Sequence, residues 1–453
     1  MANINRREFL KTNAAATFSL ALAGTGIGKA ESPANYKDIR LGIVGMGNRG
    51  KALLRTLLTI RGIKITALCD IDKEKLAFAQ EMVVKAGQRK PEGYSKNEYV
   101  FKQLMNRDDL DAVIITTPWE WHTPMAVYGM KAGKYVGVEV PATQTVEDCW
   151  ELVKTYEQTK VPCMMMENWS FRRDNLAVLN IIRKGLFGQI VHCHCAHSHD
   201  CIDHFFFDAE TGKDRWAAKY LVNRNRDQYP SHQLGPVISW LDIGNGDYFD
   251  YVTATATDSR SINDYFMHKF GPDHSNSKRK YDQGDIVTTV IRTKKGKTIV
   301  DNYDMQLPRP YDNRWSIQGT RGIYNEQRNS IYLKDKSPEY HQWEPFGPYQ
   351  EEYDHIWWKV MQGKVSPTGH EDTSVDKQLQ LGHGGTDYLE LKLFTNAVRN
   401  KTQTPLDVYD AAVMCITGPL SEKSIANGSA PVKCPDFTGG RWKTQKKVFA
   451  LDI

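Results

Sequence analysis

The stretch "IRLGIVGMGNRG", residues 39–50, decides the fold of this chain. Its apolar first half is typical of a buried strand, and it leads into Gly45, Gly47 and Gly50 and then into the helical pattern "KALLRTLL". In this motif the first glycine permits a tight turn, the second lets the backbone approach a pyrophosphate, and the third lets a helix pack closely on a strand. The stretch therefore predicts a strand, a turn and a helix that together bind a dinucleotide.

The acid that ends the next strand indicates which dinucleotide is bound. The β-rich run "IKITALCD" ends in Asp70, twenty residues after Gly50. A carboxylate at this position accepts hydrogen bonds from the adenosine ribose hydroxyls and repels a phosphate on that ribose. We therefore expect NAD rather than NADP. A glycine turn beside a solvated aspartate is the plainer alternative.

Three further runs, "LDAVIITTP", "YVGVEVP" and "PCMMMENW", are typical of buried parallel strands, and "HTPMAVYGMKAGK" is typical of a helix. Ligands in such sheets bind beyond the carboxyl ends of the strands. Six side chains that follow these strands are therefore expected to face one crevice: Trp119, Glu120, Trp121, His122, Glu139 and Asn168. Packing of the tryptophans and capping of the helix by the histidine are the structural alternatives.

The pattern changes near Arg172. A helical stretch, "RRDNLAVLNIIRKGLFG", precedes the strand-like "QIVHCHCAHSHD", and "DIVTTVIRT" and "GKTIVDNYDM" are typical of antiparallel strands. Two late stretches, "GGTDYLELKLFTNAVRN" and "DVYDAAVMCITGPLSEKSIANG", are predicted helices that return to the first domain. The predicted fold is α/β, with a Rossmann domain over residues 36–170. An α+β domain with a largely antiparallel open sheet is expected over residues 171–453, with the active site between the two.

Composition narrows the class of protein. The chain has 453 residues, of which 40% are hydrophobic and 25% charged, so it is long enough for two globular domains. Its formal charge of +5 is spread along the sequence, which gives no reason to expect nucleic acid as a partner. The eight cysteines form no CxxC framework, and we expect mostly free thiols.

Residues 1–30 predict an export signal. Arg6 and Arg7 precede a short run rich in small and apolar residues that ends at Ala30, the layout of a twin-arginine signal. The run is too short and too rich in Ala, Gly and Thr to span a bilayer well. We expect a periplasmic protein with no membrane span after removal of the signal.

The sequence resembles the glucose-fructose oxidoreductase and inositol dehydrogenase family. Within it, the sequence is most similar to the NAD-dependent glycoside hydrolases of family 109, known for alpha-N-acetylgalactosaminidase activity. The matching stretches include "GMGNRG", "PWEWHTPMA", "VEVPA", "MMENW", "RKGLFGQIVH", "LPRPY", "IQGTRG" and "GHGGTDYL". With "YPSHQLGPVISWLDIGNGDYFD" they cover almost the whole chain after the signal. Relatives with such an open sheet often pair through it, so a homo-oligomer is an expectation.

The resemblance implies which residues contact NAD and which contact the sugar. Besides Gly45 and Gly47 of the glycine motif, the implied NAD contacts are Asn48, Arg49, Asp70, Trp119, Glu120, Trp121, His122, Glu139, Val140 and Asn168. The implied sugar contacts are Tyr229, Pro230, Ser231, His232 and Tyr311. His197 stands where the branch usually carries tyrosine, and Ala217 where it carries arginine after Trp216. These two departures put the preferred sugar in question, and Arg215 or Arg224 is a candidate replacement for the missing cation.

The resemblance also implies a mechanism that does without the lysine of related sugar dehydrogenases, whose place is taken by Val140. NAD accepts hydride from sugar carbon 3, the ketone acidifies carbon 2, the group on carbon 1 is eliminated, water adds, and the hydride returns. This route replaces the two carboxylates of ordinary glycosidases. His232 is the first candidate for proton transfer, because its ordinary pKa lies near neutrality. Tyr229 and Tyr311 are further candidates, as bases if their pKa is lowered or as sugar-binding hydroxyls.

Other functions remain open at this point. A sugar or polyol dehydrogenase and a catalytically silent sugar-binding protein share the same fold. A metal site is a third alternative, because four histidines lie within eight residues and two of them, His192 and His194, share one face of a strand. The other members of this cluster are His197 and His199, with Cys193, Cys195, Asp200, Asp203 and His204 close by. The nucleotide motif already accounts for the chemistry, so we expect no metal.

Overall fold

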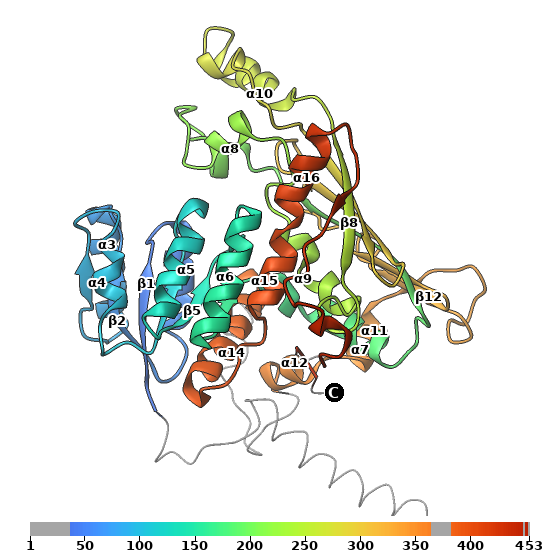
Figure 1. The fold of residues 1–453 in the computed structure, drawn as a ribbon, viewed down its shortest axis with the longest axis horizontal. Coiled ribbons are helices and arrows are strands. Elements are labelled where there is room, and N and C mark those ends of the chain that lie inside the picture. The colour runs from blue at the N-terminus through green and yellow to red at the C-terminus, as the bar shows by residue number, and fades with distance from the viewer. Residues whose placement is uncertain (1–36, 364–381, 447–448, 452–453) are drawn as a thin grey trace, which may run out of the picture.

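The computed structural model describes residues 37–363, 382–446 and 449–451. The predicted export signal at residues 1–30 lies outside this part of the chain. Two sheets with helices between them form the molecule (Figure 1). No helix among the described residues combines the length and apolar character needed to cross a membrane.

The first sheet has six parallel strands in the order β3-β2-β1-β4-β5-β6. Its strands are β1 (Ile39–Val44), β2 (Ile63–Cys69), β3 (Glu92–Tyr94), β4 (Ala112–Ile115), β5 (Tyr135–Val138) and β6 (Cys163–Met165). Its helices are α2 (Asn48–Leu57), α3 (Lys73–Lys85), α4 (Phe101–Met105), α5 (His122–Lys131) and α6 (Val146–Thr159). All four residues of β4 are buried, as expected for a parallel strand covered on both faces. The strand order reverses between β1 and β4, where this fold binds its ligand.

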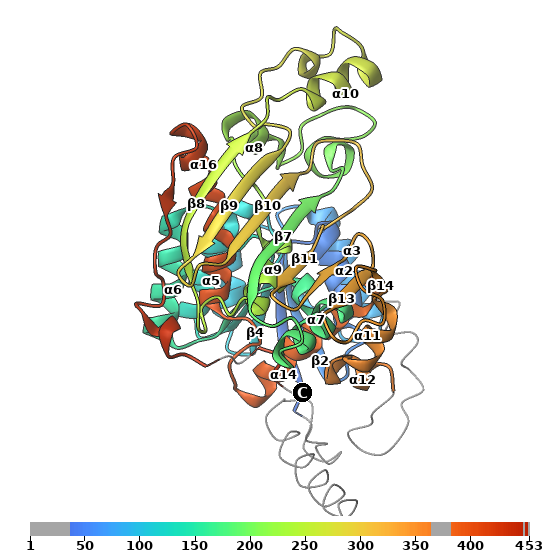
Figure 2. The same ribbon diagram turned by 90° about the vertical axis from the view of Figure 1, so that its right-hand side faces the viewer.

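The second sheet has nine strands in the order β14-β13-β12-β11-β7-β10-β9-β8-β15, seen face-on in Figure 2. Its strands are β7 (Ile190–Ser198), β8 (Phe249–Ala256), β9 (Val287–Thr293), β10 (Thr298–Asp304), β11 (Ser316–Gly319), β12 (Gly322–Asn325), β13 (Ser330–Leu333), β14 (Glu344–Pro345) and β15 (Val432–Lys433). Only the β7–β10 pair is parallel among the pairings described. The predicted fold class is therefore confirmed, with a parallel first sheet and a largely antiparallel second one.

The remaining helices follow the first sheet in the chain. They are α7 (Arg173–Arg183), α8 (Ala218–Asn223), α9 (Ser231–Trp240), α10 (Ser261–Phe270), α11 (Gly347–Glu352), α12 (Ile356–Met361), α14 (Thr386–Asn400), α15 (Val408–Cys415) and α16 (Thr417–Ala426). α14 packs against α2 and α15 against α6, so the end of the chain returns to the first sheet (Figure 1). α9 packs against β7, and α16 against β8.

One predicted helix is divided in two. The stretch that begins at Asp407 forms α15 and α16 with Ile416 between them. Pro419 lies in the first turn of α16, where it lacks the N–H for a continuous helix and its ring would clash with the carbonyl of Cys415. The break lets the last two helices pack on different partners.

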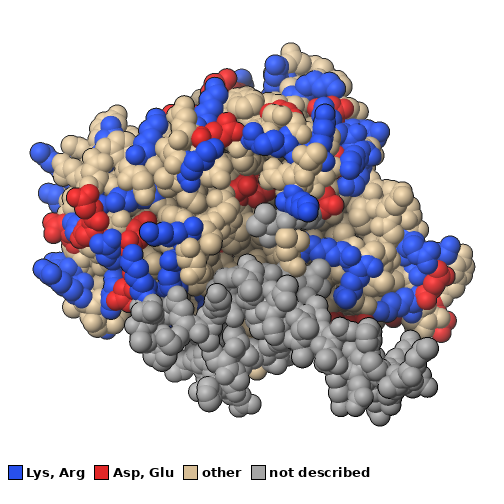
Figure 3. Space-filling view, turned by 60° about the horizontal axis from the view of Figure 1, so that its bottom comes forward, with Lys and Arg blue, Asp and Glu red and all other residues tan. Residues whose placement is uncertain are grey.

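Two expectations from composition can be compared with the structure. All eight cysteines are free thiols, as expected. Lys and Arg side chains on the face drawn in Figure 3 are interspersed with Asp and Glu rather than separated from them. This arrangement agrees with the spread of charge along the sequence.

Candidate active site

A cavity of about 1080 Å³ lies between the carboxyl ends of the first sheet and the second domain. It is lined by most of the residues expected at the site: Gly45, Gly47, Asn48, Arg49, Asp70, Trp119, Trp121, His122, Glu139, Val140, Asn168, His197, Tyr229, His232 and Tyr311. The two ends of the cavity meet at Trp119, whose ring centroid lies 5.6 Å from that of Tyr229. One continuous space therefore joins the predicted nucleotide end to the predicted sugar end.

The nucleotide end is built as the glycine motif requires. Gly45 has a φ of +95°, a conformation that other residues rarely adopt. A Cβ on Gly50 would lie 2.0 Å from the carbonyl oxygen of Gly45, whereas a Cβ on Gly47 would meet nothing within 4 Å. The open space at Gly47 lies at the N-terminus of α2, where no side chain caps the helix. Free backbone N–H groups and the helix dipole suit a pyrophosphate there.

Asp70 has a second role besides its predicted one. Its Oδ2 accepts the backbone N–H of Met46, and its Oδ1 accepts that of Asp72 at 2.8 Å. The carboxylate that faces the cavity therefore also braces the glycine loop. This bond is specific to the folded loop, and the strand pattern alone does not predict it.

Arg49 and Asn168 meet at an acid that was not predicted, and Arg49 links this acid to Glu139. Arg49 Nε donates to Glu139 Oε1 at 2.5 Å, and its Nη1 donates to Asp387 Oδ2 at 2.7 Å. Asn168 Nδ2 donates to Asp387 Oδ1 at 2.7 Å. Asp387 lies in the first turn of α14, inside the stretch "GHGGTDYL". Three predicted cofactor contacts are thus held in place by a helix from the other end of the chain.

Asp387 is ionised despite its burial. Burial raises its pKa, but the charge of Arg49 and the hydrogen bond from His383 outweigh this effect and hold the pKa well below the usual range. Its contribution to stability is therefore complete above the unfolded-state pKa of about 4 and is lost as the pH falls below it.

Changing Asp387 to Asn is expected to lower the free energy of unfolding by about 3 kcal/mol at pH 7, because it leaves Arg49 partly unpaired. The difference in the free energy of unfolding between the variant and the wild type should shrink between pH 4 and pH 3, because the stabilisation from the wild-type carboxylate declines in this range. Urea unfolding at the two pH values measures both effects. Asp258→Asn, at a side chain that is 81% exposed, is the control. A pH-independent difference would contradict this account.

At the sugar end, His232 is held by Glu167. His232 is the second residue of α9, and its Nδ1 lies 2.8 Å from Glu167 Oε1. Glu167 Oε2 also accepts the N–H and the hydroxyl of Ser170, at 2.8 and 2.6 Å. A Cβ on Gly235 would lie 1.9 Å from Glu167 Oε2, which explains a glycine within this helix. Glu167 lies in the quoted stretch "MMENW", but no local pattern showed that it faces His232.

The Glu167–His232 pair has one exchangeable proton near neutral pH. Burial raises the pKa of Glu167 to about 8. Burial, His383 and Arg49 hold the pKa of His232 well below its usual range. When Glu167 is protonated, its carboxyl O–H donates to Nδ1 of His232, and the hydrogen of the neutral imidazole is on Nε2. When Glu167 is ionised, Nδ1–H donates to the carboxylate, and Nε2 becomes a free base.

Glu167→Gln is expected to abolish the rise of kcat/KM with pH near pH 8, because Gln has no proton to lose. The wild type should gain activity through this range as the base form of His232 appears. The rate above pH 8 should fall on the order of 10²-fold. A pH profile between pH 5 and pH 10 tests this positioning role. A Gln variant that keeps the wild-type pH dependence would exclude it, whereas a merely structural role would lower stability without altering the profile.

The two tyrosines do not meet the condition for a base. Burial raises the pKa of Tyr229 well above its usual range. Burial also raises the pKa of Tyr311, although 39% of the residue is exposed, and its hydroxyl accepts the indole N–H of Trp169 at 2.6 Å. Both phenols suit hydrogen bonding to a sugar better than proton abstraction. His197 completes this wall, with its ring centroid 4.9 Å from that of Tyr229.

Three predicted contact residues do not line the cavity. Glu120 instead accepts Lys219 Nζ at 2.6 Å and the Tyr220 hydroxyl at 2.8 Å, which ties the first domain to α8. Pro230 and Ser231 are buried at the start of α9, where they support His232. Of the two candidate replacement cations, Arg215 lines the cavity and Arg224 does not.

The histidine pair considered for a metal is used in the sheet. His192 Nδ1 lies 2.9 Å from Thr298 Oγ1, and His194 Nε2 lies 2.9 Å from Asn302 Oδ1. Neither histidine lines the cavity. These rings are cross-strand hydrogen-bonding groups between β7 and β10.

Comparison with known proteins identifies the class and then the family. Residues 39–167 match the family "Oxidoreductase family, NAD-binding Rossmann fold", and the first domain is an NAD-binding domain of this class. Residues 171–444 match "Glycosyl hydrolase 109, C-terminal domain". The chain belongs to the glycosyl hydrolase 109 family.

Similar proteins span the full chain. A glycosyl hydrolase family 109 protein of Stenotrophomonas maltophilia is 37% identical over 100% of this chain and 99% of its own. An alpha-N-acetylgalactosaminidase of Tannerella forsythia is 38% identical over 98% of this chain and 99% of its own. The crystal structure of myo-inositol dehydrogenase from Lactobacillus casei, in complex with NAD(H) and myo-inositol, has a TM-score of 0.61 at 14% identity. It covers 90% of this chain and 100% of its own. At that identity it shows a shared fold.

Proposed function

We propose that this protein hydrolyses alpha-linked N-acetylgalactosaminides with NAD as a cofactor that is regenerated in each turnover. The observation that carries the proposal is the continuous cavity, in which a dinucleotide loop and a histidine–carboxyl pair face the same space. The full-length likeness to a protein named alpha-N-acetylgalactosaminidase supports the choice of sugar.

The chain's own residues have separable tasks in this reaction. NAD bound in the cavity would supply an acceptor and a donor of hydride for the sugar. Gly47 and the N-terminus of α2 would hold its pyrophosphate, and Asp70 its ribose hydroxyls. His232 Nε2 removes a proton from the sugar when Glu167 is ionised. Tyr229, His197 and Tyr311 hold the sugar hydroxyls beside it.

Three residues near the sugar, His197, Ala217 and Arg215, change the hydrogen bonding that is expected there. The imidazole of His197 replaces the phenol usual in the branch, and burial holds its pKa well below the usual range, so it offers a neutral ring. Ala217 is fully buried, and Arg215 brings a cation to the cavity wall two residues earlier. We therefore expect hydrogen bonding to the sugar that differs from the usual pattern of the branch.

Proton NMR in deuterated water tests the function directly. The purified protein would be given alpha- and beta-linked aryl N-acetylgalactosaminides, galactosides and glucosides, with no added NAD. Release of sugar with deuterium at carbon 2 supports the proposal and identifies the sugar. Release without exchange would overturn the redox route in favour of direct displacement. Steady NADH formation after addition of NAD, without release, would make the protein a sugar dehydrogenase.

We also propose that the protein is exported folded, through its twin-arginine motif at Arg6 and Arg7. A cofactor that is regenerated in every turnover would serve a periplasmic enzyme, because it can be loaded before export. Periplasmic fractions of cells expressing the chain should contain the protein. An Arg6→Lys, Arg7→Lys variant should stay in the cytoplasm, and unchanged export of this variant would contradict the route.

A further inference from the structure

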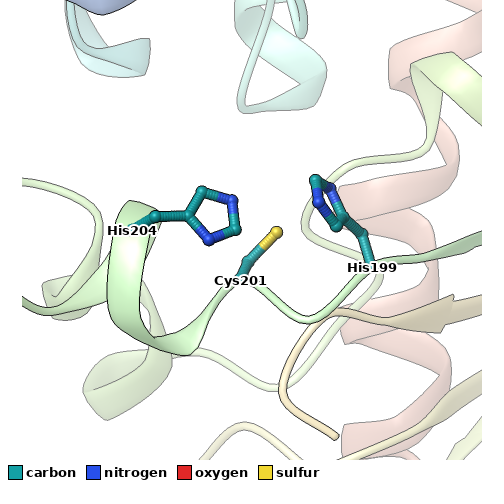
Figure 4. A group of neighbouring side chains, drawn as sticks. All are labelled: His199, Cys201 and His204. Atoms are coloured by element: carbon teal, nitrogen blue, oxygen red, sulfur yellow. The ribbon is translucent and has the colours of Figure 1, made fainter. Parts of the chain in front are cut away.

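Three side chains that can bind metal converge on one wall of the cavity. They are His199, Cys201 and His204, which follow β7 and enter the helical turn Ile202–Phe206. One ligand atom from each lies within 4.8 Å of the others, and all three residues line the cavity. Figure 4 shows the two imidazole rings on either side of the Cys201 sulfur.

The ring nitrogens of His199 and the sulfur of Cys201 are uncommitted. No hydrogen bond within the described ranges involves a ring nitrogen of His199 or the sulfur of Cys201. Other residues of the same types are engaged, because the His122 ring bonds two backbone carbonyls and Cys195 bonds Asp301. A nearly buried thiol between two imidazoles with no partner points to a ligand that is not part of the chain.

The surroundings favour a cation. Asp200 and Asp203 are negative charges close to the Cys201 sulfur, and they favour a cation beside it. His204 Nδ1 lies 3.8 Å from Asp203 Oδ1, and a carboxylate beside a ligand histidine commonly orients its ring.

We propose that His199, Cys201 and His204 bind a zinc ion. Two imidazole nitrogens and one sulfur are donors that zinc accepts in a four-coordinate site, and copper is the other cation that binds such a set. Zinc–ligand bonds of about 2.0–2.3 Å place neighbouring donors roughly 3.3–3.6 Å apart. The three donor atoms must therefore move slightly closer together when zinc binds. The His204 side chain is 51% exposed and free to rotate inward. Binding displaces the thiol proton to solvent and forms a zinc–thiolate bond.

Three protein ligands leave a fourth position open toward the cavity. The His199 ring lies 4.8 Å from that of Tyr311, so the ion would stand beside the wall that holds the sugar. A water or a sugar oxygen would complete its coordination. The assignment of a sugar oxygen rests on the proposed function, whereas metal binding does not. The site uses His199 and His204 of the histidine cluster considered from the sequence, where no metal was expected, and not the pair His192 and His194.

Cobalt(II) titration of the metal-stripped, NAD-containing protein tests the site, because a cobalt–thiolate bond absorbs in the near ultraviolet. We expect one cobalt ion per chain with that absorption band, displaced by an equal amount of zinc. Cys201→Ser should remove the band, and His204→Ala should weaken cobalt binding at least tenfold. The half-exposed His204 makes its variant safe for folding even if the Cys201 variant is unstable.

Matched controls separate this site from surface binding. Cys434→Ser and His268→Ala alter a thiol and an exposed imidazole elsewhere, and both should titrate as the wild type does. Absence of the thiolate band, or equal binding by the His204→Ala variant, would overturn the proposal. Either result leaves the glycosidase test unaffected, because no step of that reaction runs through the metal.

Discussion

Changing His232 to Ala is expected to lower kcat by about 10²- to 10⁴-fold while NAD stays bound, because the variant loses the group that transfers the proton. His232 has a carboxyl partner, Glu167, which can switch the Nε2 of His232 between donor and base. Hydrolysis of the sugar identified by NMR measures the loss in kcat. The NAD absorbance of the purified variant shows whether the cofactor end is intact.

Two further variants of the same type keep this result interpretable. His232→Gln retains a hydrogen bond to Glu167 without the base, so it should be as inactive as His232→Ala but more stable. His268→Ala removes an imidazole that is 79% exposed and should leave kcat unchanged. Activity within threefold of the wild type in both His232 variants would remove this residue from the mechanism.

Changing Gly50 to Ala is expected to produce a protein without NAD. The new Cβ would lie 2.0 Å from the carbonyl oxygen of Gly45 and 2.7 Å from the Thr116 hydroxyl. Backbone atoms cannot yield at that distance, so α2 must move away from β1 and the pyrophosphate site must open. We expect a loss of about 1–3 kcal/mol in stability and no cofactor in the purified protein. Absorbance and thermal unfolding measure these two quantities.

Gly47→Ala is the matched control for Gly50→Ala. The added Cβ at this position meets nothing within 4 Å, and the φ of −69° is open to any residue. This variant should therefore unfold at the wild-type temperature while its NAD affinity falls, because the methyl group occupies the approach of the pyrophosphate. A Gly50→Ala protein with wild-type stability and a full load of NAD would contradict the packing account.

The two ends of the cavity are coupled electrostatically. Arg49 belongs to the glycine loop, yet its charge contributes to lowering the pKa of His232 at the sugar end. Asp387 acts on the same imidazole with the opposite sign. The Arg49–Asp387 ion pair therefore influences the pKa of His232 and also holds the glycine loop in place. Its components come from α2 and α14, which no local pattern relates.

Local pattern was sufficient for the first domain and for the glycine loop. Residues 39–50, the acid at Asp70 and the alternating strands are short-range features, because strand burial and turn geometry depend on neighbouring residues. The resemblance to a family added the sugar wall around Tyr229, His232 and Tyr311. The structure brings these to one cavity, as expected from the rule that ligands bind at the carboxyl ends of strands.

The sequence by itself determined the dinucleotide fold and its cofactor, and the family resemblance singled out His232 as a candidate. The tertiary structure alone decided which distant groups contact these residues and change their pKa values. Asp387 reaches Arg49 across 338 residues of sequence, Glu167 reaches His232 across 65, and the His199, Cys201 and His204 donors converge because the chain turns after β7. Proton affinities and metal geometry depend on burial and on distances of a few ångströms between distant segments. Those distances are set by packing, not by the order of residues.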